Sequence, residues 1–290
     1  METKDYALNL ADITTWFQMD DTNFPAYIEA TGCRRIVVGS YVCGKYYMKS
    51  MNFGRSIFPL AQQKGYKISV VAPLTLESQA DMTKNQTGSF LYSNAGLADE
   101  VIVNDYAMLQ YMYELREAYG GSYTITAGRL FFKNYRDPRY DAYQDETLVS
   151  YFPQFLEGKV GAVELDMCSR RLDVTDFPAD VRIHMHYPLV YMTNNQKCEF
   201  AAAQSPDSAK FRNFSPCGMN CAKAVIHTKT PNAEFYHFGK GVYGKVPEDF
   251  HLIGRENGPD RYIYCPLLDF LEMEKDAALI VPVERQVAES

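Results

Sequence analysis

The stretch RRIVVGSYVCGKYYMKSMNFGRSIFPLAQQKGYKISVVAP, residues 34–73, contains two apolar runs separated by a helix-compatible segment. The runs RRIVVGS (34–40) and YKISVVAP (66–73) are near-continuous in Val and Ile, which is typical of strands buried on both faces. The segment FGRSIFPLAQQKG (53–65) lies between them and ends in Gly, as helices often do. The stretch therefore predicts a strand–helix–strand unit with a right-handed crossover.

The same alternation extends along most of the chain. Further strand-like runs are DEVIVND (99–105), SYTITAGR (122–129), VGAVELDM (160–167) and DVRIHMHYPLVY (180–191). Helix-compatible segments are DYAMLQYMYELREAYGG (105–121), with Asp before it and Gly-Gly after it, and DETLVSYFPQFLEGK (145–159). A strand near 7–13 and another near 250–253 bring the count close to eight. We therefore expect a single TIM-like (β/α)8 barrel over residues 1–290 rather than an open doubly wound sheet.

Residues 192–248 break this rhythm. They are rich in Asn, Ser, Pro, Lys and Gly and show little periodicity. A long stretch of this kind inside a compact domain is usually functional or disordered. We expect an irregular, cysteine-containing excursion from the barrel here.

Composition limits the partners. The 290 residues carry a formal net charge of −7, which disfavours a nucleic-acid footprint built from clustered Lys and Arg. The N-terminus has neither a basic start nor an apolar core, and no run has the length of a membrane span, so we expect a cytoplasmic protein without a span. Seven cysteines in a reducing compartment suggest a metal or redox site rather than disulfides.

Four cysteines are candidate ligands. Cys43 follows the 34–40 run, Cys198 follows the 180–191 run, and Cys217 and Cys221 lie in SPCGMNC (215–221). Functional groups of such barrels lie at the carboxyl ends of the strands, where all four can meet. Cys168, at the end of the 160–167 strand, is a reserve ligand.

Other interpretations of the cysteines remain open. Buried Cys is common in cores, and we assign Cys33, which precedes its strand, and Cys265 to the core. The polar neighbours of Cys217 and Cys221 fit that interpretation poorly. Four thiolates suit either zinc or a [4Fe–4S] cluster, and the spacing alone does not choose between them.

Four polar residues near strand ends are candidate catalytic groups. Glu164 and Asp166 can act as an acid or a base, and Arg129 can bind a carboxylate through two hydrogen bonds. His186 fits a pocket role as well as a strand-end histidine satisfied locally. Tyr236 and His237 adjoin a Gly-rich turn that lacks the strand-to-helix context of a phosphate loop, so we expect no nucleotide site.

The sequence resembles the collagenase-like (PrtC-type) peptidase U-thirty-two family, in particular its UbiV-like group. The most specific segment is HYPLVY (186–191), followed by a cysteine and then by a pair separated by three residues. The linker MTNNQK (192–197) and the gap between Cys198 and Cys217 are longer than usual in the family, and its paired-Asn motif is blurred at Lys133-Asn134-Tyr135. Other similar segments are IVVGSYVCGK (36–45), KISVVAPLTLESQADM (67–82), DEVIVNDYAML (99–109) and ITAGRLFFKNY (125–135).

The resemblance carries expectations about cofactor and function. It implies a TIM-like barrel with a [4Fe–4S] cluster on Cys43, Cys198, Cys217 and Cys221. It also implies oxygen-independent hydroxylation, with prephenate as a possible oxygen source, of a small aromatic or quinone-precursor substrate in ubiquinone-type biosynthesis, and a heteromer with a UbiU-like paralogue. The alternatives are a collagenase-like peptidase, for which the sequence shows no Ser–His–Asp or His-Glu-x-x-His signature, and a non-catalytic scaffold bearing a cluster or zinc.

Overall fold

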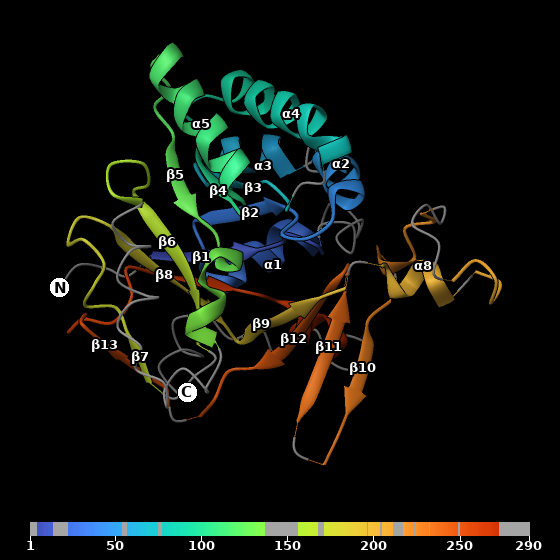
Figure 1. Cartoon of the computed structure of the whole chain (residues 1–290). Helices are drawn as coiled ribbons and strands as arrows, with labels where there is room; N and C mark the ends of the chain where they lie inside the picture. The colour runs from blue at the N-terminus through green and yellow to red at the C-terminus, as the bar shows by residue number, and fades with distance from the viewer. Residues whose placement is uncertain are drawn as a thin grey trace.

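The structure, a computed structural model, describes residues 5–13, 23–53, 57–74, 77–136, 156–167, 171–195, 197–203, 205–210, 217–222, 224–231, 233–248 and 250–272. Its centre is a closed barrel of eight parallel strands, ordered β1-β14-β8-β6-β5-β4-β3-β2 (Figure 1). The expected TIM-like α/β barrel is therefore confirmed. The barrel strands are β1 (Asp5–Asn9), β2 (Arg35–Gly39), β3 (Lys67–Val71), β4 (Ala98–Val103), β5 (Thr124–Ala127), β6 (Ala162–Asp166), β8 (Arg182–Tyr187) and β14 (Arg261–Tyr264).

The helices between the strands bury one face on the barrel. Helix α5 shows why the sequence folds this way: the Asp105 side chain accepts a hydrogen bond from the Met108 N–H, and Gly120 ends the helix in the left-handed conformation. In Figure 1 the helices α2 to α5 gather over the strands β2 to β5. The helical elements are α1 (Asn23–Thr31), α2 (Gly44–Phe53), α3 (Ile57–Lys64), η3 (Glu77–Gln79), α4 (Ala80–Ser93), α5 (Tyr106–Tyr119), η4 (Arg129–Arg136), α8 (Glu199–Ala203), η5 (Asn220–Ala222) and α9 (Leu267–Glu272).

Two expected strands differ from the structure. The strand near 250–253 is β13 (His251–Ile253), which pairs with β7 (Arg171–Asp173) outside the barrel, whereas β14 closes the barrel against β1. The expected strand 180–191 is divided at the cis peptide bond Tyr187–Pro188 into β8 and β9 (Leu189–Asn194).

The helix predictions were incomplete. Among the described residues, five helices were not predicted: α1, α2, α4, α8 and α9. Most of the expected helix 145–159 lies outside the described residues.

The excursion after β8 is more regular than its sequence suggests. Strands β9, β10 (Ile226–Lys229), β11 (Glu234–Phe238) and β12 (Gly241–Lys245) form an antiparallel sheet in the order β10-β11-β12-β9. The Gly-rich turn after His237 connects β11 to β12. Figure 1 shows this sheet extending to one side of the barrel, with α8 beyond it. The expectation of irregular structure is wrong for these strands.

The barrel interior contains charged side chains as well as apolar ones. Toward the starts of the strands, Glu100 accepts hydrogen bonds from Arg261 at 2.6 Å, Ser69 at 2.5 Å and Thr126 at 2.6 Å. Arg35 lies 3.5 Å from the same carboxylate. We call Glu100, Arg261, Arg35 and Ser69 the lower layer.

Candidate functional site

Cys43 is fixed at the start of α2 by a short network at the barrel mouth. Its N–H donates to Ser40 Oγ at 3.0 Å, and its carbonyl accepts the Tyr47 N–H at 2.9 Å. The Ser40 hydroxyl donates to Asp12, whose other oxygen accepts the Tyr41 N–H at 3.0 Å. Asp12 follows β1, is fully buried and has a positive φ of 65°. This carboxylate therefore holds the segment 40–43 against the end of β1.

Gly39 allows that segment to leave β2. Its φ is 112°, and a Cβ at this position would lie 2.3 Å from the Val71 carbonyl oxygen of β3. Only glycine avoids this clash, because the neighbouring atom belongs to backbone that cannot move away cheaply.

The other three cysteines come from the excursion. The Cys198 carbonyl accepts the Ala202 N–H at 2.9 Å, so Cys198 stands at the start of α8. Cys217 and Cys221 flank a turn in which Met219 has a positive φ of 57°, and Cys221 lies in η5. His237 Nδ1 lies 2.8 Å from a Glu199 carboxylate oxygen, so the histidine contacts α8 rather than a nucleotide loop.

The structure brings the four cysteines together. Cys221 packs with Tyr46 of α2 and Phe200 of α8, and Cys43 and Cys198 pack against the same small cluster. Burial raises the pKa of Cys221 to about 12, and the neighbouring Cys198, Cys43 and Cys217 add to the increase. Burial also raises the pKa of Cys43 to about 11, with a further contribution from Cys217. We call these four residues the cysteine site.

The cysteine site is a group of neighbouring thiols, three of them packed in one small cluster, rather than a finished coordination sphere. Among the described residues, no three His, Cys, Asp or Glu side chains are arranged to hold a metal ion as they stand. The donor set nevertheless suits soft metal centres, because four thiols match zinc or an iron–sulfur cluster. Metal binding also requires the thiols to lose their protons, which would remove the neutral state that burial now favours.

The remaining cysteines fall elsewhere. Cys33 is buried before β2, at the opposite end of that strand from Cys43, and Cys265 is buried after β14. Both belong to the large apolar core, as expected. The reserve ligand Cys168 lies outside the described residues.

Arg129 and Asp166 form a buried ion pair at the mouth. Arg129 Nε donates to Asp166 at 3.1 Å, and a second guanidinium nitrogen donates to the other carboxylate oxygen and to the Leu189 carbonyl at 3.2 Å. The Tyr191 N–H also donates to Asp166, at 2.9 Å. The expected ligand carboxylate at Arg129 is thus supplied by the protein itself. Arg129 lies beyond β5, in η4, and the pair ties the start of β9 to the barrel.

Three tyrosines surround the guanidinium. Arg129 Cζ lies 5.5, 5.9 and 5.6 Å from the ring centres of Tyr41, Tyr191 and Tyr243, respectively. All three rings are buried. This cage and Asp12 were not predicted, because the residues that form them come from segments far apart in the chain. The signal that could have found Tyr41 is its position directly after the predicted strand 34–40, whereas Asp12 lies inside the strand predicted near 7–13 and follows β1 only because that strand ends at Asn9.

Glu164 and His186 face each other beneath this cage. Glu164 Oε2 lies 3.2 Å from His186 Nε2, and Tyr41 Oη donates to Glu164 Oε1 at 3.3 Å. Burial raises the pKa of Glu164 to about 8, and nearby Glu100 adds to the increase. Burial and then Arg129 hold the pKa of His186 well below its usual value. We call Glu164, His186, Arg129 and Asp166 the upper layer.

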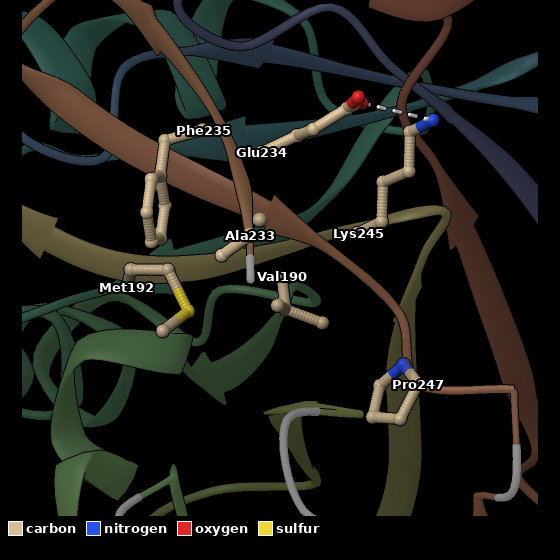
Figure 2. A pocket seen from close by; sticks show the side chains of 8 residues that line it. Val190, Met192, Ala233, Glu234, Phe235, Lys245 and Pro247 are labelled. Carbon is tan, nitrogen blue, oxygen red and sulfur yellow. Dashed lines mark ion pairs between the residues drawn. The ribbon is translucent and has the colours of Figure 1, made fainter. Parts of the chain in front are cut away.

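A surface groove lies away from this chemistry. It has a volume of about 510 Å³ and is lined by Val190, Met192, Phe235, Lys245 and neighbouring residues (Figure 2). Val190 and Met192 alternate along β9 with Tyr191, so they occupy the face of the sheet that points away from Arg129. The groove is therefore separate from both the upper layer and the cysteine site.

No protein-family model matches this chain, and no curated protein is significantly similar to it. In the described part of the chain, none of the helices combines the length and apolar character needed to cross a membrane.

Proposed function

We propose that Cys43, Cys198, Cys217 and Cys221 hold a [4Fe–4S] cluster. The supporting observation is that Cys43, Cys198 and Cys221 pack in one small cluster at the barrel mouth, with Cys217 near enough to raise the pKa of Cys221. Full thiolate ligation leaves no iron open for substrate, which favours an electron-transfer or structural role for the cluster.

The cellular role follows from the sequence resemblance. On this proposal the protein is a cytoplasmic component of an oxygen-independent, prephenate-linked hydroxylation system. It acts on a small aromatic or quinone-precursor substrate, together with a UbiU-like paralogue. The interior of the barrel contributes polar groups, and the cysteine site contributes the redox centre.

One observation favours a second candidate, a cluster-bearing scaffold for a catalytic paralogue. All four candidate catalytic side chains, those of Arg129, Glu164, Asp166 and His186, are at most 4% exposed. Side chains buried to this degree need a rearrangement of the mouth before they can touch a substrate. A scaffold would form a stable complex with its paralogue and show no hydroxylation by itself.

The test is metal and sulfide analysis of protein purified without oxygen. We expect about four irons and four sulfides per chain, with the broad visible absorption of an iron–sulfur cluster. Cys217→Ala should abolish the cluster. Cys33→Ala is the matched control and should retain the cluster, because Cys33 lies at the opposite end of β2 from Cys43. Stoichiometric zinc without iron, or full iron content in Cys217→Ala, would show the proposal to be wrong.

A further inference from the structure

Glu164 and His186 form a pair that has no complete set of hydrogen bonds. Glu164 Oε2, His186 Nδ1 and His186 Nε2 are buried without a hydrogen-bond partner among the described residues. Glu164 is 0% and His186 1% exposed. A carboxylate oxygen and a bare imidazole nitrogen, separated by 3.2 Å, would both be acceptors, so their approach is favourable only when a proton lies between them.

The charged groups around Glu164 leave it without a cation of its own. Glu100 of β4 lies on one side, and its charge is balanced by Arg261. Arg129 lies on the other, and its two-pronged interaction is taken by Asp166, two residues from Glu164 on β6. His184 and His186 of β8 are the remaining titratable neighbours on the adjacent strand, and both are held neutral by burial, which lowers the pKa of each. This environment favours the protonated form of Glu164, because an unbalanced buried carboxylate is strongly disfavoured.

A continuous network connects this pair to the cysteine site. Tyr41 donates its hydroxyl to Glu164 and its N–H to Asp12. Asp12 also accepts from Ser40, which in turn accepts the Cys43 N–H. The charge of Asp12 reaches the thiols as well, because it raises the pKa of both Cys43 and Cys221. Segment 40–43 and Asp12 therefore connect Glu164 to the cysteine site.

We propose that Glu164, backed by His186, is the proton site coupled to electron transfer at the cysteine site. At a pH of about 8 and above, where Glu164 has lost its proton, one electron that enters the cysteine site from a low-potential one-electron donor is accompanied by one proton from solvent, which binds the Glu164 carboxylate. When the electron leaves, the proton returns to solvent. Only the O–H bond of Glu164 forms and breaks, and the total charge of the barrel mouth stays constant. The proposal rests on the iron–sulfur function proposed above and assigns Glu164 a supporting role rather than contact with substrate.

The first test is the midpoint potential of the cluster-loaded protein, titrated with dithionite from about pH 6 to about pH 10. The potential should fall as pH rises through the region, near 8, in which Glu164 loses its proton. Glu164→Gln, which is neutral at every pH, should lack the fall near pH 8. Glu114→Gln, on the exposed face of α5, should follow the wild type. A level potential in the wild type overturns the proposal even if the Glu164 variant does not fold.

The second test does not use the cluster. Infrared spectra of the wild type near pH 7 should contain the carbonyl band of a buried carboxylic acid, which Glu164→Gln lacks and Glu114→Gln retains. Absence of this band in the wild type overturns the assignment of the proton to Glu164. Because iron analysis is a separate measurement, loss of the cluster would contradict the proposed function, whereas a loaded cluster with a level potential would contradict only the proton coupling.

Discussion

The two polar layers of the barrel give the same residue type opposite properties. Glu100 and Glu164 are both fully buried glutamates on parallel strands of one barrel. In the lower layer, burial favours the neutral form of Glu100, but Arg261, Arg35 and the Ser69 hydrogen bond outweigh it and hold the pKa of Glu100 far below its usual value. In the upper layer, burial dominates, and the pKa of Glu164 rises to about 8. The comparison shows that the presence of an available guanidinium, rather than burial, decides whether a glutamate in this barrel is charged.

Removing the guanidinium of the lower layer should give the largest effect. Arg261→Met leaves Glu100 as a buried carboxylate that has lost its 2.6 Å partner, and Asp5 loses its 2.6 Å contact as well. Breaking such a pair typically costs about 3–5 kcal/mol. Urea denaturation at neutral pH should show a loss of that order. A loss below about 1 kcal/mol would mean that Arg35 suffices for Glu100.

Glu164→Gln should change the pH dependence of stability. The folded-state pKa of Glu164 is raised above its unfolded value, so its contribution is fully present below about pH 4.5 and is lost as pH rises toward about 8. Over this interval the wild type should lose on the order of 2–4 kcal/mol relative to the Gln variant. Denaturation at both ends of the interval measures the difference. Parallel stability curves for the two proteins would contradict the raised pKa.

Tyr41→Phe should have the smallest effect. It removes only the 3.3 Å hydrogen bond to Glu164 and keeps the ring beside Arg129. We expect a loss of about 0.5–1 kcal/mol and a further rise in the Glu164 pKa, because the lost donor favoured the charged form. Denaturation and the infrared band of Glu164 measure the two effects. A loss comparable to that of Arg261→Met would mean that the upper layer depends on Tyr41 more than the distances indicate.

The length and composition of the strands explain which of them the sequence predicts. Strands such as β2 and β3 are continuous apolar runs and were recognised. Strand β14 was missed because it spans only four residues, Arg261–Tyr264, with a single β-branched residue among them. Strand β10 was missed because all four of its residues are exposed.

The candidate site, too, could be predicted only in part from the sequence. The positions of the strand ends predicted that Cys43 lies near the cysteines of the excursion, because the carboxyl ends of parallel barrel strands all lie at one mouth. The sequence could not show that the Arg129 guanidinium is already paired with the Asp166 carboxylate, because this pairing depends on side-chain geometry between β6 and η4. The ligand role of the cysteines stays a prediction.

The pairing of β1 with β14 has a consequence for biosynthesis. Asp5 lies opposite Arg261, so the first and last barrel strands are neighbours. Until β14 emerges from the ribosome, β1 and β8 each expose an unsatisfied backbone edge. The excursion has emerged before that point. Barrel closure is therefore a late, long-range event, which is slow and leaves the nascent chain open to aggregation.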